Sequence, residues 1–249
     1  MDACAARDSI LRLLVRVGEA CAQLMDDEMR DLPCTKLQLD EQWTFVGRKQ
    51  RRLRPEDDES SMGDFWIWSG ICADTRVVPA FRLGKRTAED ADAFVADVAG
   101  RLRNKVQLSS DGLRLYVEAV ERGFGGAVDY GQIVKTYDAE PIGPGRYSPP
   151  RVTSTEKTVV VGRPDEAHIS TYYVERLNIL NRMRCRRLTR LVDSFSRKVE
   201  NLRAALQVHF AVYNYVKRHR SLDGVTPAMA AGVSSELWEV ADLVALAGW

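Results

Sequence analysis

The sequence predicts a mixed α/β protein in which helices pack on one sheet and helical extensions lie at both ends. Three observations predict this class. Alternating apolar and polar residues, typical of half-buried strands, gather within residues 37–84. Helical patterns and short strand patterns then alternate over residues 87–137. From residue 170 onward the apolar spacing is helical, and 249 residues suffice for one large domain or one domain with an added helical part.

The first half of the chain predicts one helix followed by three strands. Residues 7–31 carry apolar side chains at helical spacing, and Pro33 ends this element. Strands are expected at residues 37–46, 65–74 and 76–84, the first two joined by a charged tip and the last two by a tight turn. Sequential strands with short connections favour an antiparallel meander.

The strand at residues 37–46 contains an acid in its interior. Leu37, Leu39, Trp43 and Phe45 share one face and are expected to hold the strand to the core. The opposite face is polar and includes Asp40. Acidic residues are poor strand formers, so a carboxylate at this position requires a physical reason.

The next segment alternates helix and strand. Helices are expected at residues 87–102 and 113–122, and strands at residues 106–108 and 130–137. The resulting order is β-β-β-α-β-α-β, followed by helices. Ribonuclease-H-like folds share this order, so we expect a ribonuclease-H-like mixed five-stranded sheet flanked by helices.

The remainder divides into an irregular excursion and two long helices. Residues 138–167 are rich in Pro and Gly, with a candidate hairpin at residues 157–161, and a loop of this length is usually functional. Helices are expected over residues 170–195 and 198–217. The predicted units are a helical N-terminal segment at residues 1–34, a mixed α/β domain at 35–197 and a helical extension at 198–249.

Positive charge is concentrated in one part of a nearly neutral chain. The formal net charge is +1, yet the segment from Arg176 to Arg220 contains twelve Arg or Lys residues and only two acids, Asp193 and Glu200. A basic face of this kind could meet a polyanion. The alternative is a solvated helix surface.

Cysteine usage and hydropathy indicate the cellular compartment. The five cysteines are odd in number and form no C-x-x-C pair, so neither a disulfide framework nor a structural zinc site is expected. No apolar run approaches the ~20 residues that span a bilayer. We expect a cytoplasmic protein without membrane partners.

Three acids are candidates for one site. Asp40 lies on the first strand, Asp111 follows the fourth strand, and Glu175 lies in the first turns of the helix at residues 170–195. In the expected fold the two strands are neighbours and the helix crosses them. Three carboxylates from separate elements would suit hard cations such as Mg²⁺ or Mn²⁺. Taken singly, Asp111 before Gly112 also fits a turn, and Glu175 also fits a helix start.

The chain resembles the DDE transposases of small bacterial insertion sequences, in particular the group related to the first-named insertion sequence. The segments that carry the resemblance are LPCTKLQLDEQWTFVGRK, GDFWIWSGICADTRVVPAFRLGKR, VQLSSDGLRLYVEAVE, HISTYYVERLNILNRMRCRRLTRLVDSFSRKVENL and YNYVKRHRSLDGVTPAMAAG. The DEQW opening, the SDG turn and the YVERLN helix start occur in the family's order.

The resemblance implies an enzyme of DNA transposition and recombination encoded by a mobile genetic element. Asp40, Asp111 and Glu175 match the family's DDE motif and would hold two Mg²⁺ or Mn²⁺ ions. The enzyme would cut double-stranded DNA at the element's ends and join the 3′ hydroxyl to target DNA, as at least a dimer. It would be associated with the nucleoid when bound to DNA.

Basic residues after Glu175 are candidates for DNA contact. At 100° per residue, Arg182 and Arg186 fall on one face of the expected helix with Glu175, which would direct them along the metal site. The alternative for these arginines is a solvated face, and for the later cluster a loop packed by its own charges. The DNA-binding candidates are Arg182, Arg186, Arg187, Arg190, Lys217, Arg218 and Arg220.

The N-terminus departs from the family pattern. Members carry a helix-turn-helix or similar domain that recognises the terminal repeats, whereas residues 6–17 resemble only the last helix of such a module. The resemblance therefore implies that residues 1–34 are a helical remnant of an N-terminal DNA-binding module and that residues 35–197 are the catalytic domain. Two hypotheses follow. One is an active metal-dependent DNA nuclease and strand transferase. The other is an inactive, truncated, non-catalytic DNA-binding relic that interferes with a full-length transposase by mixed assembly.

Overall fold

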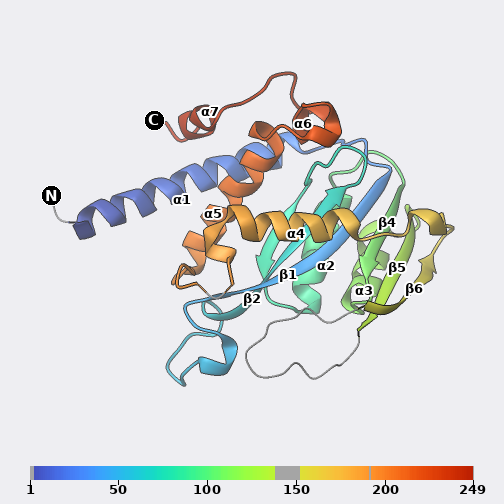
Figure 1. Cartoon of the computed structure of the whole chain (residues 1–249), viewed down its shortest axis with the longest axis horizontal. Coiled ribbons are helices and arrows are strands. Elements are labelled where there is room, and N and C mark those ends of the chain that lie inside the picture. The colour runs from blue at the N-terminus through green and yellow to red at the C-terminus, as the bar shows by residue number, and fades with distance from the viewer. Residues whose placement is uncertain (1–2, 138–151, 191, 249) are drawn as a thin grey trace.

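A six-stranded mixed sheet forms the centre of the molecule, with strand order β3-β2-β1-β4-β5-β6 (Figure 1). The computed structural model describes residues 3–137, 152–190 and 192–248. The strands are β1 (Lys36–Val46), β2 (Gly63–Cys72), β3 (Phe81–Gly84), β4 (Val106–Asp111), β5 (Val128–Tyr137) and β6 (Val152–Val161). β1, β2 and β3 form an antiparallel meander, β4 and β5 run parallel to β1, and β6 is antiparallel to β5. The predicted mixed α/β class is confirmed, and the order is compatible with a ribonuclease-H-like fold.

Helices cover both faces of this sheet. α2 and α3 lie behind it in the view of Figure 1, and α4 crosses in front over β1 and β2. α1 packs along α5, and α7 contacts α1 near the chain's C-terminus. The helices are α1 (Ala3–Glu28), α2 (Ala88–Ala99), α3 (Leu115–Phe124), α4 (Tyr172–Arg184), α5 (Val199–Ala211), α6 (Pro227–Ala230) and α7 (Val240–Ala245). Short 3₁₀ turns occupy Gln50–Arg52, Glu166–His168, Arg186–Leu188 and Arg220–Leu222, and a π turn occupies Val212–Val216.

A glycine permits the close approach of α1 to α5. A Cβ atom added at Gly18 would lie 2.7 Å from the Cα atom of Ala204, a distance that real Cβ contacts do not reach. The two backbones therefore pack without an intervening side chain. α1 is thus in direct van der Waals contact with α5.

The sixth strand is a departure from the prediction of five. Residues 152–161 lie within the expected irregular excursion, of which only residues 157–161 were assigned to a hairpin. In the structure β6 pairs with β5 from Val152 to Val161, with an irregularity near each end, and the first eight side chains of β6 are exposed. An edge strand that buries so little shows no apolar alternation, although its Thr and Val residues favour extended backbone. Residues 138–151 of the excursion lie outside the described part of the chain.

The helix predicted over residues 170–195 is shorter than expected. α4 ends at Arg184, Cys185 is extended with φ −100° and ψ 99°, and a 3₁₀ turn follows. Two interactions account for the break. The Cys185 and Leu188 side chains are buried, and the Thr189 hydroxyl donates to the Arg182 carbonyl at 3.1 Å, which satisfies a C-terminal acceptor of the helix.

Two expectations about strands also change. The third strand was predicted from residue 76, but β3 begins at Phe81, because the N–H and C=O groups of Val78 both bond to the Asn214 side chain instead of a neighbouring strand. Trp43 and Phe45 were expected in the core, but both are half-buried. Gln42, on the opposite face of β1, is buried under α4.

Among the described residues no helix has the length and apolar content needed to cross a membrane.

Candidate active site: carboxylates at the end of β4

Asp40 and Asp111 lie level with each other on neighbouring parallel strands. The β1–β4 ladder places Gln38 opposite Ser109, so two residues further along each strand Asp40 comes beside Asp111. Asp111 is the last residue of β4, whereas β1 continues to Val46. The end of β4 therefore leaves room beside β1 for side chains to meet.

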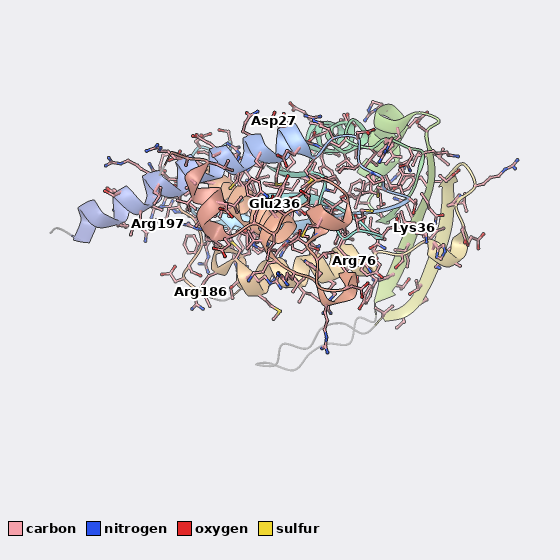
Figure 2. The ribbon with its side chains drawn as sticks, turned by 90° about the horizontal axis from the view of Figure 1, so that it is seen from above. Asp27, Lys36, Arg76, Arg186, Arg197 and Glu236 are labelled. Carbon is pink, nitrogen blue, oxygen red and sulfur yellow. The ribbon has the colours of Figure 1, made fainter. Side chains whose placement is uncertain are left out.

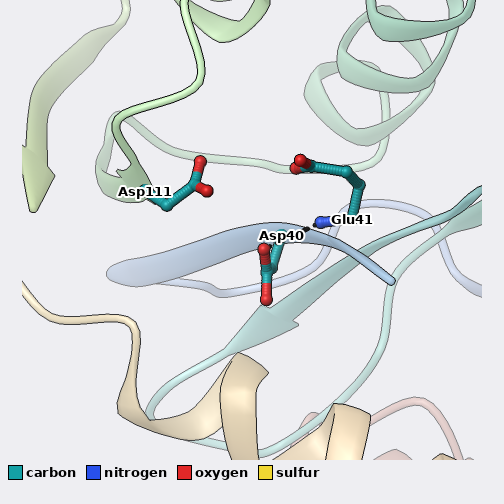
Figure 3. A group of neighbouring side chains, drawn as sticks. All are labelled: Asp40, Glu41 and Asp111. Carbon is teal, nitrogen blue, oxygen red and sulfur yellow. Dashed lines mark hydrogen bonds between the residues drawn. The ribbon is translucent and has the colours of Figure 1, made fainter. Parts of the chain in front are cut away.

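Three carboxylates meet at this point. One oxygen each from Asp40, Glu41 and Asp111 lies within 4.8 Å of the other two. Figure 3 shows Asp40 and Glu41 on opposite sides of the β1 ribbon, with Asp111 beside them at the strand end. Successive side chains of a strand point to opposite faces, so Asp111 can lie near both only because β4 stops there.

Each carboxylate is held by a different set of donors. Asp40 Oδ2 accepts from the Asn178 amide at 2.7 Å, and its Oδ1 accepts from the Glu41 N–H at 2.9 Å. Glu41 Oε1 accepts from the Arg86 guanidinium at 2.7 Å. Asp111 Oδ1 accepts from the Leu113 N–H at 3.0 Å, so the turn role of this residue is present together with its place in the cluster.

The Glu41 side chain is largely enclosed. It is 4% exposed, and Oε2 has no hydrogen-bond partner within the described chain. A buried oxygen of this kind costs free energy unless it meets a donor, a water molecule or a cation. The Tyr116 hydroxyl lies close enough to Glu41 to lower its pKa, but it too has no hydrogen bond of good geometry among the described residues. Within the described chain Oε2 is therefore left for a water molecule or a cation.

Burial and nearby negative charges raise the pKa values of Asp40 and Glu41. Burial, then the charges of Glu41 and Asp111, raise the pKa of Asp40 to about 8. Burial and then Asp111 raise the pKa of Glu41 to about 7, with Arg86 acting in the opposite direction. Three like charges this close are stable together only when protonated or when a cation neutralises them.

The polar face of β1 fixes the cluster relative to α4. Gln38 Oε1 accepts the N–H groups of Tyr173 and Val174 in the first turn of α4, at 2.7 and 3.1 Å. Gln42 donates to the Asn178 carbonyl and accepts from the Asn181 amide, each at 3.2 Å. The residue types that make β1 a poor strand by propensity are thus the ones that bond it to α4.

Glu175 lies outside the cluster of three. Its Oε1 accepts from the Thr171 hydroxyl at 2.6 Å and forms an ion pair with Lys135 of β5. Its charge still raises the pKa of Asp40, as the smallest of the contributing causes. The structure therefore brings together two of the three predicted acids and adds Glu41. The DEQW motif contains Glu41, but the residue lies on the face of β1 opposite Asp40 (Figure 3), so the sequence pattern did not select it for the site.

The predicted DNA-binding residues fall into two groups. Arg182, Arg187 and Arg190 line one cavity beside the far end of β1, with Arg187 donating to the Ser196 hydroxyl at 2.8 Å. Arg186 does not share the helical face of Glu175, because it belongs to the 3₁₀ turn after α4. It is exposed, at the same end of the molecule as Arg197 (Figure 2). The second group, between the π turn and α6, is exposed and comprises Lys217, Arg218 and Arg220.

The sheet order and the carboxylate cluster define a mixed α/β protein with an acidic site at the centre of its sheet. No family model matches the chain, and no curated protein matches it. Among solved structures it is similar to the piggyBac transposase in a cryo-EM structure of its synaptic complex with hairpin DNA. The TM-score is 0.36 at 12% identity, covering 86% of this chain and 52% of that one. The chain thus spans about half the length of that protein, and the similarity is too weak to assign a function.

The raised pKa values predict how stability depends on pH in EDTA. The unfolded Asp40 carboxyl has a pKa of ~3.9, so between that value and about 8 the folded state binds the extra proton and stability falls as pH rises. His209 and His219, whose pKa values burial lowers to about 4, oppose this trend only below pH ~6.5. Asp40→Asn should therefore gain in melting temperature relative to wild type between pH 6.5 and 8.5.

Melting curves of the two proteins at both pH values, with and without Mg²⁺, test this expectation. Mg²⁺ should raise the melting temperature of the wild type more than that of Asp40→Asn at pH 8.5. The lost Asn178 contact affects the variant at both pH values alike, so only the change with pH is diagnostic. A wild type that gains stability over the variant as pH rises would contradict the charge repulsion inferred for the cluster.

Proposed function

We propose that the chain is a metal-dependent enzyme of DNA strand cleavage and strand transfer, a DDE-type transposase of the insertion-sequence group that its sequence resembles. The observation that carries the proposal is the meeting of Asp40, Glu41 and Asp111 at the end of β4, with a buried Glu41 oxygen that lacks a partner in the described chain. The sheet order compatible with a ribonuclease-H-like fold and the DEQW, SDG and YVERLN segments support the same assignment.

The residues fit a hard divalent cation. All the candidate ligand atoms are carboxylate oxygens, which Mg²⁺ and Mn²⁺ prefer. Asp40, Glu41 and Asp111 would hold the first ion. Glu175 would contribute to a second after exchanging its Lys135 partner. When bound, two such ions activate the attacking oxygen and neutralise charge on the phosphodiester.

The chain's own residues then orient and balance this charge. Asn178 fixes the Asp40 carboxylate through its amide, and Arg86 offsets the charge of Glu41. The basic residues around Arg182 and Arg187 would hold DNA phosphates, which bind cationic side chains without regard to base sequence. Water and then a DNA 3′ hydroxyl would be the nucleophiles, so no covalent intermediate with the protein is expected. Joining two ends requires at least two copies of the chain.

An assay with pre-cut DNA ends tests the proposal. Incubation with a target duplex and Mg²⁺ should give joined products that depend on the metal, and Glu175→Gln should lose them while still binding DNA in EDTA. Joined products at equal rates with wild type and Glu175→Gln would remove this acid from the mechanism. Wild type without activity in Mg²⁺ or Mn²⁺ would instead support the second candidate, a non-catalytic DNA-binding protein. The ion pair of Glu175 with Lys135 favours that candidate.

A further inference from the structure

A cavity of about 560 Å³ lies beside the far end of β1 and has no role in holding the carboxylates. Three aromatic rings form part of its wall. Phe45 lies 5.8 Å from Trp43 and 4.7 Å from Phe195 between ring centroids, with interplanar angles of 33° and 40°. All three side chains are half-buried rather than enclosed in the core. We call this feature the aromatic pocket.

Cationic side chains surround these rings. The Lys49 ammonium lies 5.7 Å from the Trp43 ring centroid and 5.8 Å from that of Phe45, within the range of a cation–π contact. Arg182, Arg187 and Arg190 also line the cavity, against a single acid, Asp193. The excess of positive charge selects an anionic occupant, and the open aromatic faces select one with a flat, unsaturated ring.

The pocket is connected to the carboxylate cluster by one strand. Trp43 lies on the same face of β1 as Glu41 and follows it by two residues, which corresponds to about 7 Å at the rise of a β-strand. That length equals about two nucleotide steps at 3.4 Å per step along one DNA strand. A strand whose backbone lay at the carboxylates could therefore place a base a few nucleotides away in the pocket.

We propose that the aromatic pocket binds an unpaired nucleobase of a single-stranded DNA end. The base stacks on Trp43, Phe45 and Phe195, and its flanking phosphates pair with Lys49, Arg182 and Arg187. Bases in a duplex are covered on both faces by their neighbours, so this site is selective for single-stranded DNA. The assignment rests on the proposed function in taking DNA as the ligand, but the binding itself needs no metal.

Binding in EDTA tests this site separately from catalysis. Fluorescence anisotropy would compare a blunt duplex, the same duplex with a short single-stranded 3′ overhang, and that overhang carrying abasic positions. Wild type should bind the overhang roughly tenfold more tightly than the blunt or the abasic DNA, the effect expected of stacking one base on an aromatic side chain. Trp43→Leu should lose this preference while its affinity for the blunt duplex stays within about twofold.

Trp238→Leu is the matched control, because this tryptophan is also half-buried but packs on Tyr215, outside the pocket. It should retain the preference, and overhang DNA should quench tryptophan fluorescence in this variant but not in Trp43→Leu. Phe195→Ala should reproduce the loss and substitutes for Trp43→Leu if that variant does not fold. Equal affinity of wild type for overhang and blunt DNA would overturn the proposal, even if Mg²⁺-dependent joining were intact. The proposal would also be overturned if Trp43→Leu and Phe195→Ala both kept the wild-type preference for overhang DNA. It would equally be overturned if these variants bound DNA as wild type does but no longer self-associated, because the pocket would then be a contact between copies of the chain.

Discussion

Asp111→Asn is expected to lower Mg²⁺-dependent strand cleavage and joining by on the order of a thousandfold, equivalent to about 4 kcal/mol of transition-state stabilisation. The residue ends β4 at the level of Asp40, and its carboxylate is the one that approaches acids from both faces of β1. Asparagine retains an oxygen that can accept the Leu113 N–H, so the turn should persist. The loss would therefore come from the missing negative charge.

Single-turnover rates on pre-cut DNA ends, at saturating Mg²⁺, measure this effect. Glu118→Gln is a suitable control, since it lies on α3 just after the same turn, 72% exposed and paired only with Arg122 within the described chain. Its rate should stay within about twofold of wild type, because an exposed ion pair contributes little. Asp111→Asn that keeps more than a tenth of the wild-type rate, with normal folding, would exclude the residue from the reaction centre.

Asn181→Leu is expected to lower the free energy of unfolding by about 2–4 kcal/mol, because it leaves buried polar atoms without partners. The Asn181 side chain is fully buried and bonds to Gln42 on β1 at 3.2 Å and to His209 on α5 at 2.9 Å. For a chain of this size the loss corresponds to a fall in melting temperature of roughly 5–15 °C. The network holds β1, α4 and α5 in register, so the same variant should also slow strand joining.

Denaturant unfolding followed by circular dichroism measures the change in stability. Ile179→Ala provides the control on the same helix, because Ile179 is 58% exposed. It should change the free energy of unfolding by less than ~0.5 kcal/mol. A stability loss for Asn181→Leu no greater than that of Ile179→Ala would mean that the buried amide contributes nothing to the attachment of α4.

The sequence alone was sufficient for the part of the site that lies on regular strands. Asp40 was identifiable because a carboxylate violates strand propensity, and Asp111 because it ends a short strand before a turn. Their proximity followed from the expected pairing of the two strands, and the register of Gln38 opposite Ser109 agrees with it. The alternation of side chains along a strand and the pairing of neighbouring strands follow regular geometry. The positions of Asp40 and Asp111 could therefore be predicted from the sequence.

The rest depended on where elements end, which the pattern did not encode. Glu41 enters the cluster because β4 stops at Asp111, so a side chain on the face of β1 opposite Asp40 also comes near Asp111 (Figure 3). Arg186 does not lie on the predicted helix face, because the buried and extended Cys185 ends α4 before it. Glu175 lies in α4 as expected, but it pairs with Lys135 of β5, a residue that no motif or spacing distinguishes from the other lysines of the chain. Each of these outcomes was decided by tertiary contacts.

The most direct test of the central claim is the position of Mn²⁺ in a crystal of the protein, located by anomalous scattering. The proposed site predicts a peak between the carboxylates of Asp40, Glu41 and Asp111 that disappears in Asp111→Asn. A second peak shared by Asp40 and Glu175 would show that Glu175 has exchanged its Lys135 partner for metal. Mn²⁺ bound only at other surface acids, with the three carboxylates unoccupied at pH 8.5, would contradict the assignment of this cluster as a metal site.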